Sequence, residues 1–190
     1  MGGHALECDT ERADPHHYLN IYVQVQQRLQ DQWPEVVSYL PRKHRFKQDH
    51  GDLDLLIRRD TVDLSREWIK SEFGVDEVVV NDGVWTFGVG LEIPPSDTSK
   101  VSTLQVDLVT KKKEHWEMTK AFFDQSGLGN LQCKMARWFR YKWGFQGLRM
   151  PVYRNPEGER SVKYGEYVLT RDPEEAFEFL GFEWERFKEG

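Results

Sequence analysis

Two aspartates stand two residues apart in an apolar segment of the chain. The run Gly51-Asp52-Leu53-Asp54-Leu55-Leu56-Ile57 alternates acids with leucines, which predicts a β-strand. On a strand, side chains two positions apart emerge from the same face, so Asp52 and Asp54 would lie roughly 7 Å apart at their Cα atoms. Neighbouring carboxylates repel each other unless a cation or hydrogen-bond donors lie between them, and hard oxygen ligands suit Mg²⁺. The pair therefore indicates a metal site.

A third acid lies in another apolar segment. Asp107 is surrounded by Val106, Leu108 and Val109 in a predicted strand over residues 102–110. If this strand pairs beside the first, its carboxylate completes a three-acid cluster for two metal ions about 3.5–4 Å apart. An isolated Asp-x-Asp pair is more often a solvent-facing strand edge or turn. Here the apolar strand and the basic residues upstream of it favour the metal site.

These motifs resemble the DNA polymerase beta-like nucleotidyltransferase superfamily. The resemblance lies in Gly2-Gly3, in Lys47-x-x-x-Gly51-Asp52-Leu53-Asp54 and in Leu104-x-Val106-Asp107-Leu108-Val109, and it covers about residues 1–110. The signature of the superfamily is a glycine pair, an acid-x-acid strand and a third acid on a neighbouring strand. Further along the chain, residues 127–130 and 179–181 more loosely resemble a viral or fungal branch.

The resemblance implies that Asp52 and Asp54 hold two Mg²⁺ or Mn²⁺ ions, and that Asp107 binds the catalytic ion and helps to deprotonate an acceptor hydroxyl. That hydroxyl would attack the α-phosphorus of an NTP in line, and pyrophosphate would leave. The expected enzyme is a metal-dependent, template-independent nucleotidyltransferase that transfers NMP to an RNA or tRNA end, a small molecule or a protein. Two alternatives use the same fold or acids: a catalytically degenerate nucleotide-sensing or protein-binding module, and a two-metal phosphodiesterase.

Four residues are expected to bind the nucleotide. By the same resemblance, Gly2 and Gly3 would offer backbone N–H groups to the triphosphate, since glycine permits close approach. Lys47 precedes Asp52 by five residues and would neutralise phosphate charge as a point cation. Gly51 would lie with them. The separation between the glycine pair and the acid pair is longer than is usual in the family, which implies an inserted helix.

The first 110 residues combine helical and strand-like patterns that would position these side chains. Apolar periodicity and turn residues predict helices over 16–32 and 65–73, and strands over 36–40, 51–57, 77–80, 85–91 and 102–110. Ser65 and Gly74 are the expected caps of the second helix, and Asp82-Gly83 the expected hairpin turn. The expected fold class is α+β, with a palm-like mixed-sheet nucleotidyltransferase core over residues 1–110.

Residues 111–190 are expected to form a mainly helical lobe packed on that core. The pattern predicts helices over 114–125, over 130–143 with Asn130 as N-cap, and after Asp172, with strands over 148–153 and 162–169. The middle helix interleaves cations with aromatic residues, a composition that suits phosphate contact and base stacking. Aromatic residues at this spacing more often form a core. The residues concerned are Lys134, Arg137, Arg140 and Lys142, with Trp138, Phe139, Tyr141 and Trp143.

Composition narrows the class of protein. The chain has 190 residues, of which 38% are hydrophobic and 31% charged, enough to build a core and too apolar for intrinsic disorder. No apolar run approaches the roughly 20 residues of a membrane-spanning helix, and Cys8 and Cys133 lack metal-binding spacing. A cytoplasmic protein without a membrane partner is expected. The net charge of −6 argues against indiscriminate coating of nucleic acid, while basic clusters at 42–47, 111–113 and 134–142 allow a nucleotide or RNA substrate.

Overall fold

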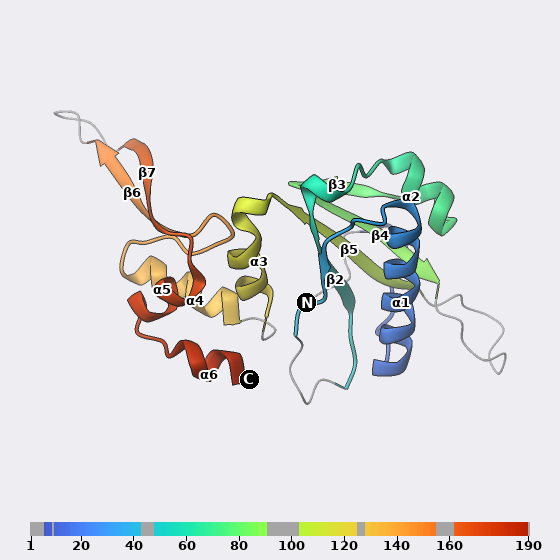
Figure 1. Ribbon diagram of the computed structural model, residues 1–190, viewed down its shortest axis with the longest axis horizontal. Helices are drawn as coiled ribbons and strands as arrows, with labels where there is room; N and C mark the ends of the chain where they lie inside the picture. Colours follow the sequence, from blue (N-terminus) through green and yellow to red (C-terminus); the bar gives the residue numbers. More distant parts are fainter. Residues whose placement is uncertain are drawn as a thin grey trace. The chain divides into compact units, whose positions relative to one another are not determined.

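Strand-like and helical segments together produce an α+β protein with a five-stranded mixed sheet, a β-hairpin and several helices (Figure 1). The structure is a computed structural model that describes residues 6–8, 10–42, 48–90, 103–124, 128–154 and 162–189. The chain divides into a first unit, Met1–Leu40 with Arg45–Lys113, and a second unit, Pro41–His44 with Glu114–Gly190. Within the described ranges, no helix has both the length and the apolar character required to cross a bilayer. The expected α+β class is confirmed.

The sheet of the first unit has the strand order β1-β2-β5-β4-β3. Strands β2 and β5 are parallel, whereas all other neighbours are antiparallel. The prediction that the two acid-bearing strands pair side by side is therefore confirmed. The strand bounds are β1 (Ser38–Tyr39), β2 (Asp52–Arg58), β3 (Val79–Asn81), β4 (Val84–Gly90) and β5 (Thr103–Lys111).

The predicted Asp-Gly hairpin turn joins β3 to β4. Asp82 has φ 45° and Gly83 has φ 75°, so both central residues adopt the positive φ that a primed two-residue turn requires. A Cβ at Gly83 would also come within 3.1 Å of the Thr110 carbonyl oxygen, while the Thr110 N–H donates to the Gly83 carbonyl at 2.7 Å. The turn thus needs glycine both for its backbone conformation and for its close approach to β5.

Helices α1 (Pro15–Gln32) and α2 (Arg66–Phe73) cover one face of this sheet (Figure 1). As predicted, Ser65 caps α2 by accepting from the Trp68 N–H, and Gly74 ends it in the left-handed conformation. Residues of both helices share a buried core with Leu53 and Leu55 of β2. Because side chains alternate along a strand, Asp52 and Asp54 emerge on the face that these helices do not cover.

The second unit surrounds a cluster of aromatic rings centred on Phe177. Its ring lies 4.4 Å from that of Phe187 and 5.0 Å from that of Trp184, measured between centroids. Trp143 and Phe182 contact it as well. The elements are α3 (Trp116–Phe123), α4 (Leu128–Trp138), β6 (Leu148–Arg154), β7 (Val162–Thr170), α5 (Pro173–Phe179) and α6 (Trp184–Glu189), and short 3-10 helices occur at Arg59–Thr61 and Lys113–His115.

Two helix predictions in this unit are wrong in detail. Helix α4 begins at Leu128, so Asn130 lies inside its first turn and is not the N-cap. The helix ends at Trp138 because Arg140 adopts φ 63° and the Tyr141 N–H turns back to the Ala136 carbonyl. The expected last helix is divided into α5 and α6, which are separated by a turn in which Gly181 has φ 82°.

Glu166 of β7 joins the hairpin β6–β7 to the segment that follows α4. Its carboxylate accepts from the ammonium groups of Lys142 and Lys163, each at 2.5 Å, and from the Arg149 guanidinium. Backbone hydrogen bonds between Lys142 and Arg149, at 2.7 and 2.8 Å, extend the hairpin by one bridge. Hydrogen bonds from Lys142 and then Lys163 lower the pKa of Glu166 to about 2.

Replacing Glu166 by Gln is expected to lower the free energy of unfolding by roughly 1–2 kcal/mol at pH 7, since hydrogen bonds to charged groups are lost. A lowered pKa means that the ionised carboxylate stabilises the fold above its ordinary pKa of 4.5, and that this contribution is lost as the pH falls towards 2. Urea denaturation at a series of pH values should show the difference between wild type and Glu166→Gln shrinking over that window. A difference independent of pH would contradict the assignment. Glu183→Gln removes an exposed ion pair and serves as the control with a small effect.

Candidate functional site

The three predicted acids, Asp52, Asp54 and Asp107, share one face of the sheet in the first unit, which we call the acid face. Asp54 of β2 and Asp107 of β5 are register partners, and Asp52 is the partner of Gln105. Neighbouring strands lie about 4.8 Å apart, so the three carboxylates are gathered within a small area. All three aspartates are half-buried, while Leu53 between the first two is fully buried on the opposite face. The parallel pairing thus brings together the acids that the sequence placed far apart.

Asp107 is held by two neutral donors. Its Oδ1 accepts from the Thr86 hydroxyl at 2.6 Å, and its Oδ2 accepts from the Gln105 side-chain amide at 2.9 Å. Thr86 is its register partner on β4, and both donor residues are buried. Burial raises the pKa of Asp107, the two hydrogen bonds lower it, and the charges of Asp54 and Asp52 raise it again. The net direction is upwards, so the ionised form of Asp107 is less favourable here than in an exposed aspartate.

This set of oxygen donors is chemically suited to a hard divalent cation. Mg²⁺ takes one or two carboxylates and keeps several waters, and a cation would relieve the repulsion that raises the pKa of Asp107. Across the described residues, however, no group of three or more His, Cys, Asp or Glu side chains is arranged to hold a metal ion. Thr86 and Gln105 occupy the Asp107 oxygens instead. The oxygen donors suit a metal ion by their chemistry, and such an ion would compete with Thr86 and Gln105 for Asp107.

Arg12 is a cation near the acids that the sequence did not reveal. Its Nη2 lies 2.7 Å from the Asp49 carboxylate, and the hydrogen bond to Asp49, then the charge of Asp49 and, more weakly, that of Asp52 raise the pKa of Arg12. The Arg12 side chain is about half exposed, so it remains accessible to an anion. No spacing pattern in the sequence links residue 12 to residue 52, because the contact depends on how the segment before α1 crosses the start of β2.

Tyr18 is a second residue that the sequence did not reveal, because its position fits the apolar periodicity of the helix predicted over residues 16–32. Its ring stacks on His50 with centroids 4.0 Å apart, and His50 exchanges backbone hydrogen bonds with Ala13. The buried Tyr18 hydroxyl has no hydrogen-bond partner among the described residues. Burial, followed by the charges of Asp54 and Asp52, raises the pKa of Tyr18. The hydroxyl is therefore a neutral donor near the acid face.

The predicted nucleotide-binding residues are only partly placed by the structure. Gly51 is buried directly before β2, beside the acids. Gly2, Gly3 and Lys47 lie outside the described residues. Of the basic segment 42–47, only Arg42 is described: its backbone N–H and Nε donate to Asp124 at 2.9 and 3.1 Å, so it stabilises the second unit.

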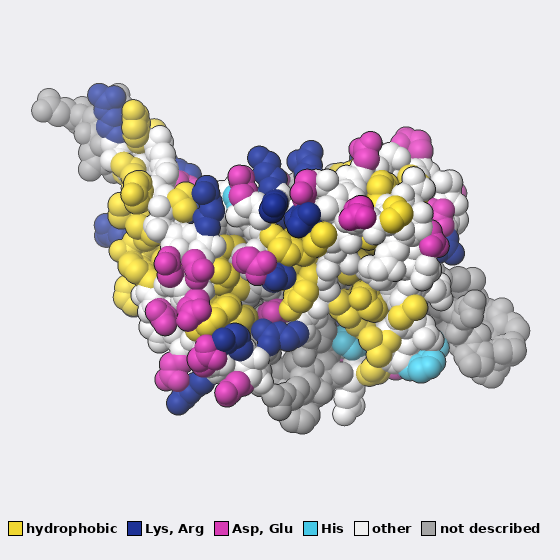
Figure 2. Space-filling model, viewed as in Figure 1, with side chains coloured by type: hydrophobic (Ala, Val, Ile, Leu, Met, Phe, Trp, Pro, Cys, Tyr) yellow, Lys and Arg dark blue, Asp and Glu magenta, His cyan; other side chains and the backbone are white. Residues whose placement is uncertain are grey.

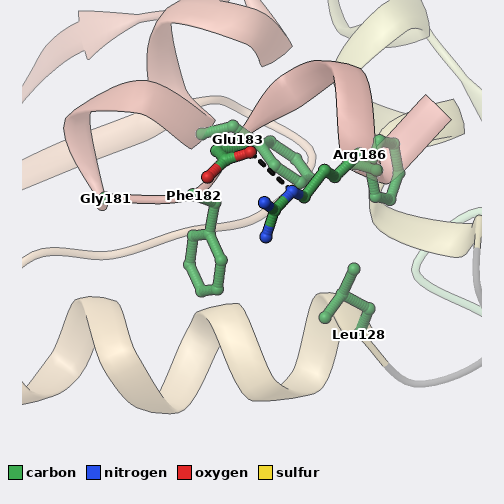
Figure 3. A pocket seen from close by; sticks show the side chains of 7 residues that line it. Leu128, Gly181, Phe182, Glu183 and Arg186 are labelled. Carbon is green, nitrogen blue, oxygen red and sulfur yellow. Dashed lines mark ion pairs between the residues drawn. The ribbon is translucent and has the colours of Figure 1, made fainter. Parts of the chain in front are cut away.

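A concave feature of the second unit has a different character. A pocket of about 360 Å³ lies between the start of α4 and the segment from Phe177 to Phe187. Figure 3 shows Arg186 and Glu183 pointing towards each other across it, with their ion pair at 2.7 Å. The remaining lining residues are phenylalanines, Leu128 and Gly181. Because its charged residues neutralise each other, this pocket offers less chemistry than the acid face, which is the candidate site.

Comparison with known proteins adds no identification. A scan against protein-family models gives no match, and a search of curated proteins finds no relative. Function must therefore be argued from the geometry and chemistry of the site, since a fold alone does not define an activity.

Replacing Asp107 by Asn is expected to raise the Tm at pH 7 by a few degrees when no metal is present, because the raised pKa shows that the ionised carboxylate is less favourable in the folded state. The sign follows from linkage: a carboxylate with a raised pKa reduces stability at higher pH, and this cost disappears as the pH falls below the ordinary value of 3.8. Thermal unfolding in EDTA at neutral pH and at about pH 3 measures the effect. A variant that is equally destabilised at both pH values would refute it.

Proposed function

We propose that this chain is a metal-dependent, template-independent nucleotidyltransferase that transfers NMP from an NTP to a hydroxyl acceptor and releases pyrophosphate. The observation that carries the proposal is the register of β2 and β5, which sets Asp54 beside Asp107 and Asp52 on the same face. The sequence motifs that resemble the DNA polymerase beta-like superfamily support it, and the palm-like interpretation of the sheet belongs to the same proposal. An RNA or tRNA end is the proposed acceptor class.

Each acid has a distinct role in this proposal. Asp52 and Asp54 would hold Mg²⁺ or Mn²⁺ with Asp107 as a further ligand, and the bound ions would neutralise charge on the triphosphate and on the attacking oxygen. Asp107 would take the proton of the acceptor hydroxyl on a carboxylate oxygen. Thr86 and Gln105 fix the orientation of its carboxylate for that role. The acceptor oxygen then bonds to the α-phosphorus as the bond to pyrophosphate breaks.

The proposed nucleotide contacts complete the site. Gly51, beside the acids, would allow the triphosphate to approach the backbone, and Gly2, Gly3 and Lys47 keep the roles that the resemblance implies. Arg12 adds an accessible cation whose pKa is affected by Asp52. A guanidinium suits phosphate through its several parallel N–H donors.

A second candidate function is a nucleotide-binding module that does not catalyse transfer. Two observations favour it. Thr86 and Gln105 donate hydrogen bonds to both carboxylate oxygens of Asp107, and among the described residues no three His, Cys, Asp or Glu side chains are arranged to hold a metal ion. Such a module would bind NTP without Mg²⁺ and never release pyrophosphate, which calorimetry and a pyrophosphate assay distinguish from the enzyme.

Asp54→Asn is expected to reduce pyrophosphate release from NTP by about a hundredfold or more, because it removes charge where the transition state needs it. The assay uses the full chain with Mg²⁺ or Mn²⁺, each of the four NTPs, and tRNA or single-stranded RNA as acceptor. Asp63→Asn is the matched control, since Asp63 is an exposed aspartate of the same unit and should retain full activity. Unchanged transfer of NMP by Asp54→Asn would contradict the proposal. Degradation of RNA without NTP would indicate a phosphodiesterase instead.

Mg²⁺ alone is expected to stabilise the wild type, because an ion that binds only the folded state adds about 1.4 kcal/mol at ten times its Kd. For a chain of this size that corresponds to a Tm increase of about 3 °C. The double variant Asp52→Asn/Asp54→Asn should lose the shift, whereas Asp63→Asn should keep it. An equal shift in all three proteins would place the bound ion elsewhere.

A further inference from the structure

Charge is segregated along the chain of the second unit. Residues 134–171 contain nine Lys or Arg and three Glu, whereas residues 172–190 contain two Lys or Arg and seven Asp or Glu. The described residues of the first stretch include the end of α4 and the hairpin β6–β7, and those of the second include α5 and α6. Figure 2 shows acidic side chains gathered over α5 and α6 and hydrophobic ones along the hairpin. A basic surface of this kind attracts a polyanion even though the chain is acidic overall.

Aromatic rings on the basic stretch are turned to solvent. The exposed fractions are 85% for Trp138, 78% for Tyr164 and 63% for Tyr167. Tyr167 is the cross-strand partner of Met150, which is also exposed, so one face of the hairpin presents a ring and a thioether side by side. The buried aromatic cluster of this unit, centred on Phe177, does not include them. Exposed rings of this size are a common sign of a binding surface.

Several cations beside these rings are available for a ligand. Within the described ranges, the side chains of Lys134, Arg137, Arg140 and Arg154 form no hydrogen bond or ion pair. Arg137 directly precedes Trp138 in the chain. Cations and rings therefore alternate at a spacing that suits the phosphates and bases of a polynucleotide strand.

The Glu166 cluster places further positive charge on the other face of the hairpin, because Glu166 directly precedes Tyr167 on β7 and side chains alternate along a strand. Three cations, Lys142, Arg149 and Lys163, bind this one carboxylate, so two positive charges remain uncompensated. The lysine side chains are 41% and 44% exposed, and Lys163 directly precedes Tyr164. Like charges held together in this way gain from a further anion, and a phosphate group is suited to that position.

We propose that the end of α4 and the hairpin β6–β7 bind a single-stranded polynucleotide. Its phosphates contact the cations around Trp138 and Arg154, which lies on the same face of the hairpin as Tyr167, and its bases stack on Trp138, Tyr164 and Tyr167. Exposed rings favour unpaired bases over a duplex, whose bases are already stacked. Interleaved rings and guanidinium groups also fit a polynucleotide better than a lipid surface, for which a broad aliphatic face is typical. This binding does not rest on the proposed transfer activity, since it needs neither NTP nor metal.

Fluorescence anisotropy of the full chain with fluorescein-labelled 12-mers of U and of dT, in EDTA and without NTP, tests the proposal. Trp138→Ala is expected to weaken binding by on the order of tenfold, and Phe179→Ala, an exposed ring on the acidic helix α5, should leave it unchanged. The double variant Arg137→Gln/Arg154→Gln should reduce the slope of log K against log salt by about 1.4, or about 0.7 per phosphate contact. Arg59→Gln/Arg66→Gln makes the same change of charge on exposed residues of the first unit and should not alter the slope.

Three results would overturn the proposal: no binding of either 12-mer at low salt, equal affinity for a 12-base-pair duplex, or wild-type affinity in Trp138→Ala. Binding to phosphatidylserine vesicles that is lost in the same variants, without oligonucleotide binding, would assign the surface to a membrane instead. Thermal unfolding of each variant verifies that it is folded. Asp52→Asn/Asp54→Asn should bind the 12-mers like wild type, so a failure of transfer and a failure of binding are distinguishable.

Discussion

The parallel pairing of β2 with β5 is the constraint on which the candidate site depends. Its register sets Asp54 beside Asp107 and, in the same step, turns Leu53 and Leu55 towards the core under α1 and α2. A shift of one residue in β2 would reverse this order and bury the acids, so the apolar alternation fixes the register strongly. Burial of leucines on one face thus stabilises a sheet that gathers repelling carboxylates on the other.

The acid face combines charge repulsion with restraint by neutral groups. Asp107 is buried and lies near two other carboxylates, which makes its ionised form unfavourable, yet Thr86 and Gln105 hold it in one orientation. Sites that reduce stability in this way are typical of function, because activity and maximal stability favour different side chains. A bound cation would reverse the direction of the pKa shift of Asp107, because it favours the ionised carboxylate.

The sequence predicted correctly those elements that are determined by residues close together in the chain. The cap at Ser65, the primed turn at Asp82-Gly83 and the acid-bearing strands all follow from residues within a few positions of one another. The end of α4 did not, because Arg140 adopts a left-handed conformation that is rare outside glycine. The contacts of Asp107 with Thr86 also depend on strand order. Alternation along β5 could have indicated Gln105, which lies two residues away on the same face.

The net charge of the chain is a sum over an acidic surface and a basic surface, so it describes neither surface by itself. The acid face of the first unit requires positive charge from a ligand, whereas the basic stretch 134–171 of the second unit requires negative charge. The acidic stretch that follows it, residues 172–190, repels polyanions and limits how far along the protein one can bind. Selectivity for unpaired bases then comes from the exposed rings, since charge alone attracts any polyanion. A negative total charge is therefore compatible with a specific polynucleotide surface, because that surface needs only a local excess of cations beside rings.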